Sequence, residues 1–517
     1  MLKRMLAVGL TVGLAAVIMA SCGGNNTPSS RVVGKGVLYT FIGDTPASDV
    51  LSLRTTVTGL TLRQEGTTNR VTVFPSSATT TSSVRMDFAS LRDFATVLTI
   101  AGVPDVTYDE ATITLSGAQI IVYDPANDPP IRVVTGQMSV SALVIPIQPA
   151  LTIVKDKVAA LRLDFDMLRS IKVDAHGQVS GKLTPIMKAS PVVLTEGQGY
   201  GEFDDLVGFV RTVMAYPISQ VFTGAFTVQT LSGTGPALTV NLTSATQLYD
   251  VYQEGVPALN KVETGRLVEV DAMVDENGNL VAKTVEFEDR AVVADSKLAF
   301  LGYVIAVTKD NNGNVTQFSL FVREEEPDAS SQVPLDSVVV VNVAPLCAIP
   351  PPAPPTPPTP PSCTTFLFSS RPTNFAGLPF DARAVAPGQE LIVHGAYTKT
   401  TNRPTTVDAN MIYLKLQTVQ GNLGSLVQVG SDDKTGAFWL TPSSSLLQGA
   451  PILVFTTNTA EFQTAFVNVF GLAELTPQAI LLVRGLPFYQ NQAATINGVT
   501  VPAGTLVITA GQVHQLQ

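Results

Sequence analysis

A strand pattern that occurs three times in the second part of the chain limits the folds that this sequence can adopt. Three stretches begin alike, each with a glycine in second place: residues 207–213, 301–307 and 423–429. Each is followed by a second apolar segment and, later, by a turn that leads into a strand-like segment, at residues 264–270, 387–393 and 477–483. The sequence therefore predicts three copies of one small domain.

The spacing within the copies assigns a proline-rich stretch to the second one. From the opening glycine to the second residue of the later turn, the separations are 57, 86 and 54 residues, over 208–265, 302–388 and 424–478. The middle copy is longer by 29 (86 − 57) or 32 (86 − 54) residues, and it contains the proline-rich run 345–363. This run is therefore predicted to be an insertion between two strands of one domain and not a linker between domains.

Tight turns connect the expected strands of the copies. In residues 268–273, Val and Ala alternate with Glu, Asp and Met, as in a half-buried strand. Asn277-Gly278 predicts a two-residue hairpin turn, because both residues tolerate the positive φ that this turn needs. Asn497-Gly498 is expected to do the same in the third copy, and Asn312-Gly313 to turn between the first two strands of the second. About five strands in roughly 75–100 residues suit a small barrel of OB type.

The early Gly-x-x-x-x-Val and later Asn-Gly-x-Leu-x-Ala of the first copy are similar to small uncharacterised β-barrel domains that recur in bacterial envelope proteins. The resemblance implies a barrel fold and assigns no activity.

Composition agrees with β-structure and excludes two classes of partner. A chain of 517 residues is too long for one core, and about three to five domains are expected. Hydrophobic residues make up 45% and charged residues 14%, a composition too apolar for a mostly disordered chain. The net charge is −10 and no cluster of Lys or Arg stands out. Nucleic acids and anionic lipid surfaces are therefore poor candidates as partners.

The first folded region, residues 32–195, is predicted to be a β-sandwich with one short helix. Strands are expected at residues 37–42, 50–62, 111–123, 132–144 and 160–165. Residues 87–94 carry apolar side chains at helical spacing, with Asp87 as the expected N-cap. Regularly spaced short strands with one small helix are typical of a sandwich.

Three segments of this region carry a resemblance to a known family: residues 43–50, residues 57–60, and residues 163–171 with 183–186. Together they resemble an uncharacterised domain family, a prealbumin-type, carboxypeptidase-regulatory-like β-sandwich found in bacterial lipoproteins. The most specific part is the Asp-Phe-Asp run followed by Arg169-Ser170-Ile171. The family has no established activity, so the resemblance implies a fold and a location but no site residues.

The N-terminal residues resemble a bacterial lipoprotein signal. Lys3 and Arg4 precede an apolar run over residues 5–20, and Ser21 stands before Cys22. In such signals the cysteine is lipidated and becomes the mature N-terminus. Residues 1–21 are thus expected to be the signal peptide and 22–31 a flexible tether. An ordinary cleaved signal or a membrane anchor is the alternative, although the run is shorter than the roughly 20 residues of a spanning helix.

The two other cysteines, Cys347 and Cys363, bracket the proline-rich run. An oxidising envelope favours a disulfide between them, which on the chain-entropy model stabilises by roughly 3 kcal/mol. A continuous polyproline helix would hold the two sulfurs tens of ångströms apart, at about 3.1 Å per residue. The loop must therefore bend if they pair, and two free thiols are the alternative.

Asp164 and Asp166 are the nearest approach to a paired-carboxylate site. Two residues apart on a strand, they share a face with side chains roughly 6.5–7 Å apart. Such a pair suits an inverting glycan hydrolase or a Ca²⁺ site. The simpler interpretation is a solvated row of ion pairs with Arg162 and Arg169.

Other chemistry-bearing residues favour structural interpretations. The three histidines, His176, His394 and His514, have no metal-ligand spacing, and no metal or other cofactor is expected. Residues 197–202, rich in glycine, are interpreted as a hinge between sandwich and first copy. The acidic run 323–328 is interpreted as a solvated loop, with Ca²⁺ or a basic partner as alternatives. Trp439, the only tryptophan, is either a core residue or a surface for stacking on a sugar ring.

These observations predict an all-β chain: an N-terminal β-sandwich followed by three small β-barrel-like repeats, at residues 196–292, 293–417 and 418–517, in a string of separate modules. We expect a lipid-anchored cell-envelope protein that is not an enzyme, with a structural or binding role toward polysaccharide, cell wall or an envelope protein. Gly23 is not the Asp of an inner-membrane retention signal, which favours the outer membrane. The alternatives are a carboxylate- or metal-dependent glycan hydrolase and an assembly module that adds a strand to a partner's sheet.

Overall fold

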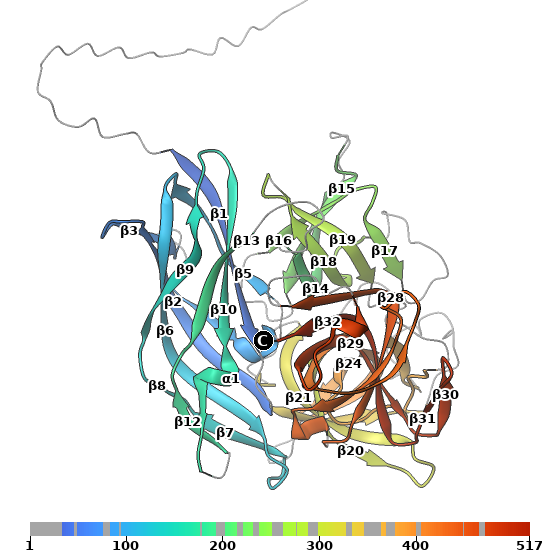
Figure 1. Ribbon diagram of the computed structural model, residues 1–517. Coiled ribbons are helices and arrows are strands. Elements are labelled where there is room, and N and C mark those ends of the chain that lie inside the picture. Colours follow the sequence, from blue (N-terminus) through green and yellow to red (C-terminus); the bar gives the residue numbers. More distant parts are fainter. Residues whose placement is uncertain are drawn as a thin grey trace, which may run out of the picture. The chain divides into compact units, whose positions relative to one another are not determined.

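The computed structural model confirms the all-β fold class (Figure 1). It describes residues 34–516 apart from 46–48, 76–82, 92–94, 176–177, 193–201, 215–220, 231–236, 251–261, 276, 288–297, 327–332, 346–362, 369–377, 400–404, 448 and 465–470. Several predictions fall on residues outside the described ranges: the signal, the tether, Cys22, Cys347 and His176. The glycine-rich hinge also lies outside them, apart from its last residue, Glu202. Within the described ranges, the helices are all too short to cross a membrane.

The N-terminal module is a ten-stranded sheet, accompanied by a three-stranded sheet in the order β11-β12-β8. The main path of the large sheet runs β3-β2-β6-β9-β13-β10-β1-β5, with β4 added on β2 and β7 on β6. The strands are β1 (Lys35–Thr45), β2 (Val50–Gln64), β3 (Arg70–Phe74), β4 (Val84–Asp87), β5 (Ala95–Pro104), β6 (Thr107–Tyr123), β7 (Ile131–Thr135), β8 (Gln137–Met138), β9 (Ala142–Thr152), β10 (Val158–Asp166), β11 (Ile171–Val173), β12 (Val179–Leu183) and β13 (Met187–Val192).

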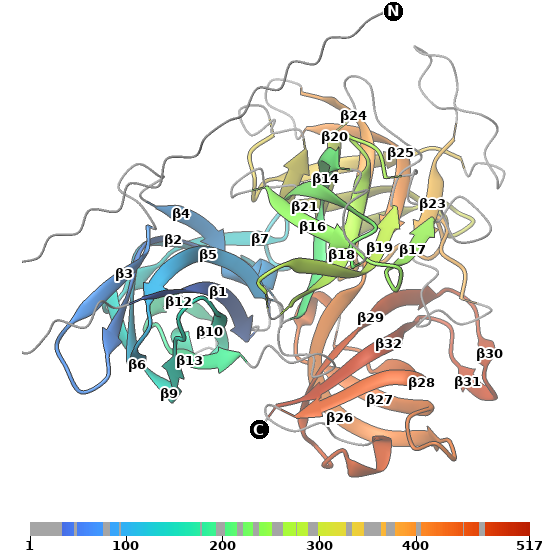
Figure 2. The ribbon, with the colours of Figure 1, turned by 90° about the horizontal axis from the view of Figure 1, so that it is seen from above.

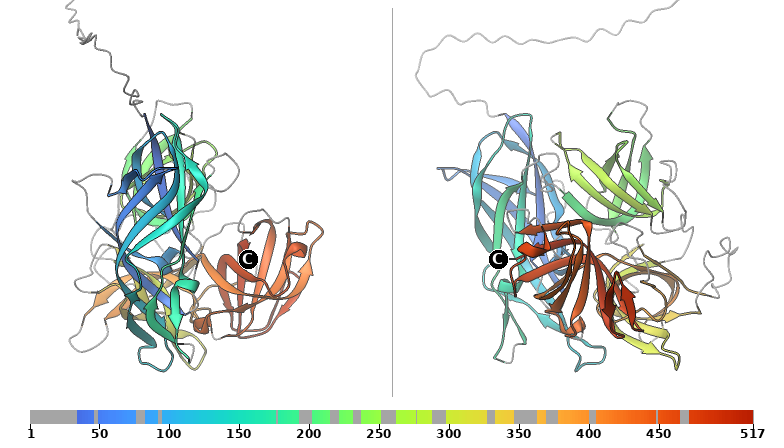
Figure 3. Two further views of the ribbon diagram at one scale, coloured as in Figure 1. Left: turned by 60° about the vertical axis from the view of Figure 1, so that its left-hand side comes forward. Right: turned by 45° about the vertical axis from the view of Figure 1, so that its right-hand side comes forward.

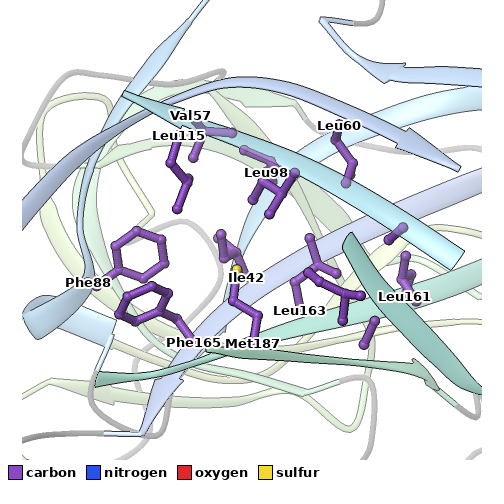
Figure 4. Close-up of a cluster of buried hydrophobic side chains, with 14 of the residues drawn as sticks. Ile42, Val57, Leu60, Phe88, Leu98, Leu115, Leu161, Leu163, Phe165 and Met187 are labelled. Atoms are coloured by element: carbon purple, nitrogen blue, oxygen red, sulfur yellow. The ribbon is translucent and has the colours of Figure 1, made fainter. Parts of the chain in front are cut away.

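The large sheet folds over its own core. Its two end strands approach each other, and the Thr99 hydroxyl of β5 donates to the Val73 carbonyl of β3 at 3.4 Å. Strand alternation turns one side of β2 and β6 toward β1 and β10, so Val57 and Leu115 share a buried cluster with Ile42 and Leu163 (Figure 4). These four side chains are at most 1% exposed, and this burial is the main stabilising contribution to the module.

Two short helical turns close this core. The helix expected near Asp87 is a 3-10 turn, η1 (Phe88–Leu91), and the Asp87 carboxylate accepts from the Ala89 N–H at 3.0 Å, as an N-cap does. The Phe88 ring meets that of Phe165 with centroids 4.5 Å apart (Figure 4). The second turn, α1 (Met167–Ser170), was not expected, because its four residues are too few to show a helical period.

Three five-stranded closed barrels follow (Figures 2 and 3). Barrel 1 contains β14 (Glu202–Met214), β15 (Gly224–Thr230), β16 (Leu238–Leu242), β18 (Leu267–Val274) and β19 (Leu280–Phe287), with β17 (Gln247–Asp250) added on β19. Barrel 2 contains β20 (Leu298–Lys309), β21 (Val315–Glu326), β22 (Val338–Val343), β24 (Glu390–Thr398) and β25 (Thr406–Leu414), with β23 (Thr365–Phe368) added on β25. Barrel 3 contains β26 (Gln417–Val429), β27 (Gly436–Pro442), β28 (Ile452–Thr464), β29 (Ile480–Gln490) and β32 (Thr505–Gln515).

The barrels share one closure and one turn. In each, the third strand pairs in parallel with the fifth: β16 with β19, β22 with β25, and β28 with β32. The fourth strand follows a turn whose residue has positive φ: Gly265 at +87°, Gly388 at +88° and Gln478 at +64°. This left-handed conformation is open to glycine without steric cost and less readily to glutamine. The later turn of the sequence repeat therefore occupies the same structural position in all three barrels.

The opening glycine of the third copy was assigned three residues too late. Gly208 lies opposite Val268 and Gly302 opposite Leu391, the second residues of the fourth strands. In barrel 3 the residue opposite Leu481 is Gly421, not Gly424. With Gly421 as the start, the separation to Gln478 is 57 residues, the same as in the first copy. The error arose because Leu423 stands before Gly424 and Leu426 and Val427 follow shortly after it, which imitates the apolar pattern of the other two copies.

Two of the Asn-Gly turns have a different form or place from that expected. Gly278 has a φ of +82°, but the main-chain hydrogen bonds around it are not those of a two-residue turn. The Gly278 N–H donates to the Asp275 carbonyl at 3.0 Å and the Asp275 N–H to that of Asn279 at 2.9 Å, the pattern of a longer hairpin loop. Asn497 and Gly498 both have positive φ, but they join an extra hairpin, β30 (Ala494–Ile496) with β31 (Val499–Val501).

The modules are not a string of separate units, because residues 34–517 cluster as one compact unit. Strand faces that alternation alone would leave to solvent carry apolar side chains, and other modules cover them. Leu51 and Ile121 of the N-terminal module share a buried cluster with Tyr303 and Ile305 of barrel 2. Leu446, from the 3-10 turn η3 (Ser445–Leu447) of barrel 3, completes this cluster. The remaining short turn is η4 (Leu472–Glu474).

Candidate functional site

The Asp164 and Asp166 side chains have different roles at the end of β10. The Asp166 carboxylate caps α1 by accepting from the Arg169 N–H at 2.9 Å, and the Arg169 Nε lies 3.5 Å from its other oxygen. Asp164 lies 3.7 Å from an Arg162 guanidinium nitrogen and directly across from Lys188 on β13. These contacts favour the ion-pair and capping interpretation over a paired acid and base.

The remaining candidate residues lie apart from this pair. Trp439 on β27 is half-buried against the hydrophobic cluster shared by barrels 2 and 3, and its neighbour Phe438 is fully buried in barrel 3. His394 on β24 is buried, and His514 is on β32. Among the described residues, no group of three or more His, Cys, Asp or Glu side chains could hold a metal ion.

The strongest polar feature of the described chain is instead a buried ionic cluster between barrels 1 and 2. Glu269 of β18 and Glu286 of β19 lie directly opposite each other and are at most 1% exposed. The Lys415 ammonium, which follows β25, donates to the Glu269 carboxylate, and the Tyr413 hydroxyl donates to that of Glu286 at 3.0 Å. Two carboxylates buried face to face would repel each other, and the cation from the next barrel offsets that cost.

The burial of Glu269 corrects the expectation from alternation. Its strand position does lie on the outer face of the barrel, as predicted, but barrel 2 covers that face. Leu267 of the same strand packs against Leu301 and Ile392 of barrel 2. The signal in the sequence was Lys415, the only charged residue between Asp408 and Asp432 and flanked by two leucines. A lone cation in such a run indicates a buried, paired side chain.

A second ionic cluster joins the N-terminal module to barrel 2. The Arg54 Nε on β2 lies 2.8 Å from Asp336 Oδ2 and 3.8 Å from Asp87 Oδ2, and a terminal guanidinium nitrogen donates to the Arg323 carbonyl at 3.2 Å. The Asp336 side chain is 8% exposed. Burial raises the pKa of Asp336 to about 6, and the Asp87 charge adds to this, whereas Arg54, Ser52 and Arg85 act against it.

The acidic run at residue 323 is not a solvated loop. Arg323–Glu326 is the end of β21, and Arg323 and Glu325 are 4% and 2% exposed. The Arg323 guanidinium donates to the Tyr303 hydroxyl and to the Glu390 carboxylate of neighbouring strands. The density of charged residues in this run predicts exposure to solvent. Residues two apart on a strand share a face, however, and the face that carries Arg323 and Glu325 is covered.

Hydrogen bonds also bring together the two ends of the proline-rich insertion. The Thr364 N–H donates to the Pro345 carbonyl at 3.0 Å, and the Ala344 N–H donates to the Thr364 hydroxyl at 2.9 Å. The strands before and after the insertion, β22 and β23, both pair with β25 of barrel 2. Cys363 is half-buried beside this junction.

Comparison with known proteins gives one family match. A family model described as a domain of unknown function (DUF4382) matches residues 35–185. This match confirms the expected resemblance of the N-terminal module to an uncharacterised domain family. No curated protein matches the chain. A solved structure titled "drosophila Unr CSD456" is similar over 60% of this chain and 97% of that chain, at 8% identity and a TM-score of 0.13, a likeness too low to carry an argument.

Proposed function

We propose that the protein is a lipid-anchored, non-enzymatic scaffold or binding protein of the bacterial cell envelope. The observation that carries the proposal is the packing of four β-modules into one compact unit through buried apolar and ionic contacts. A lipoprotein-like signal ending at Cys22 precedes this unit in the sequence. Several modules that share buried contacts present many loops and outer strand faces, which suits binding an extended partner.

The ligand classes that we propose are polysaccharide, cell wall or another envelope protein. The outer membrane is the proposed location in a bacterium with two membranes, because Gly23 follows the cysteine. Acyl chains on Cys22 supply the anchor, and one chain alone would bind a membrane only marginally. The tether of residues 22–31 would let the unit stand away from the bilayer.

Replacing Cys22 by alanine in the full-length protein is expected to abolish membrane association, because this residue carries the acyl chains. Sedimentation of cell membranes after a carbonate wash measures the effect, and incorporation of labelled palmitate measures the modification. The matched control is Cys363→Ala, which should stay with the membranes. A Cys22→Ala protein that still sediments with membranes would contradict the anchor.

We also propose that Cys347 and Cys363 form a disulfide. Hydrogen bonds from Thr364 to Pro345 and from Ala344 to Thr364 hold the two sides of the insertion together. Pro345 stands two residues before Cys347, and Thr364 directly follows Cys363. Non-reduced proteolytic digests of the protein isolated from cell membranes should contain a peptide linking the two, and reduction should lower stability by up to about 3 kcal/mol. Rapid alkylation of both cysteines in the denatured, non-reduced protein would show that they are free thiols.

A further inference from the structure

The second half of strand β26 presents an edge of barrel 3. Over Gln417 to Asn422 this strand pairs with β29, and from Gly421 to Val429 it pairs with β27, with register shifts between Leu423 and Leu426 and between Leu426 and Gln428. Beyond Asn422, β27 is its one partner among the described strands. Residues 424–429, which we call the barrel 3 edge, therefore have no second strand partner among the described strands.

The barrel 3 edge is both exposed and uncharged. All six of its residues are exposed, with Leu426 and Val427 at 41% and Val429 at 45%. No charged residue occurs from Gln417 to Ser431. Proteins usually protect exposed strand edges with β-bulges, charged side chains, proline or a covering element, because a bare edge pairs with other strands. Of these devices, the barrel 3 edge shows only the register shifts of β26.

The equivalent edges of the other two barrels have further protection, besides the register shift that all three first strands show at this position. Val210, Val304 and Leu423 are equivalent, since each N–H donates to the carbonyl of the residue after the positive-φ turn. The next residue is Arg211 in barrel 1, an exposed cation. In barrel 2 it is Ile305, which is 2% exposed beneath the N-terminal module and η3. The edge position of barrel 2 is thus already a contact surface between modules. Among the described residues, only the equivalent edge of barrel 3 is both uncovered and uncharged.

A second copy of the chain is the partner that this edge fits. In a two-fold contact the same surface meets itself, so a charged residue beside the axis would lie close to the same charge of the other copy. The neutral run from Gln417 to Ser431 avoids that repulsion in a chain whose net charge is −10. Antiparallel pairing about a two-fold axis also sends the acidic turn at Asp432 and Asp433 of each copy to opposite ends of the contact.

We propose that residues 424–429 pair antiparallel with the same residues of a second copy and so join two barrel 3 sheets. This inference deepens the proposed scaffold function by naming a partner. Membrane fractionation tests the anchor and cross-linking tests the pairing, so the two proposals can fail separately.

A cysteine scan of the full-length protein in cell membranes tests the pairing. Single cysteines replace residues 425 to 428 in turn, and Val144→Cys, on exposed strand β9 at 55% exposure, is the matched control. Mild oxidation should give disulfide-linked dimers at one or two of the scanned positions, at least about tenfold faster than at 144. Rates equal to the control at all four positions would overturn the proposal, and so would a dominant adduct with a different protein.

A charge variant gives an independent measurement. Val427→Lys places like charges close to the two-fold axis. It should raise the dissociation constant of the dimer by about tenfold or more in the detergent-solubilised protein, as measured by sedimentation. Val144→Lys should leave the dimer unchanged. A wild-type protein that stays monomeric at high concentration would overturn the proposal, and the cysteine scan decides the case if Val427→Lys does not fold.

Discussion

Replacing Lys415 by methionine is expected to lower the free energy of unfolding by about 3–5 kcal/mol. The substitution keeps the volume of the side chain but removes the ammonium that binds Glu269, which is 1% exposed and lies opposite the buried Glu286. Two carboxylates would then be buried with less compensation, and the docking of barrel 1 on barrel 2 would weaken. Urea unfolding followed by the fluorescence of Trp439, the single tryptophan, measures the change.

Two further variants decide whether charge or packing is responsible. Lys155→Met alters a side chain that is 64% exposed and should change stability by less than about 0.5 kcal/mol. The double variant Lys415→Met/Glu269→Leu replaces the ion pair by an apolar pair and should recover most of the loss, since such replacements are often neutral. A double variant as unstable as the single one would show that the shape of Lys415 matters and its charge does not.

Replacing Asp336 by asparagine is expected to stabilise the protein at pH 7.5 and to have little effect at pH 4. The pKa of Asp336 is raised from 3.8 in the unfolded chain to about 6 in the folded one, because its carboxylate is buried beside Asp87. The folded state therefore holds this proton more tightly. The contribution is complete below pH 3.8 and is lost as the pH rises through 6. Two pKa units correspond to about 3 kcal/mol.

Asparagine resembles the protonated acid at every pH, so the variant should remove this part of the pH dependence. Thermal unfolding of both proteins between pH 4 and 8 measures it, with Asp156→Asn, 80% exposed, as the control. A destabilised Asp336→Asn variant at pH 7.5 would show that the 2.8 Å contact with Arg54 outweighs the cost of burial.

Local sequence was a good guide to the repeats because their defining feature is a local backbone requirement. The turn before each fourth strand needs a residue with positive φ, and Gly265, Gly388 and Gln478 were all found from the sequence pattern. The position of the opening glycine in the third copy was predicted less well. Gly424 follows Leu423 as Gly302 follows Leu301, whereas Gly421 stands between Gln420 and Asn422. Only the strand pairing with Leu481 shows that Gly421 is the residue that matches Gly208.

The candidate sites show the same difference between local features, which the sequence predicts, and long-range contacts, which it does not. Asp164 and Asp166 attracted attention because they are close in sequence, yet the local turn α1 gives Asp166 a capping role. The residues of the two ionic clusters are far apart in sequence, as Arg54 and Asp336 are, so no spacing rule brings them together. Lys415 could have been noticed as a lone charge in an uncharged run, but its partner could not have been named.

The sequence by itself determined the all-β class, the three-fold repetition and the position of the proline-rich insertion in the second barrel, since alternation and turn residues act over a few neighbouring positions. Only the tertiary structure decided which outer faces are covered. Alternation tells which side chains share a face, but burial of Glu269, Arg323 and Asp336 depends on what another module places against that face. The interior of each barrel follows from local pattern, whereas the surfaces between modules follow from long-range packing.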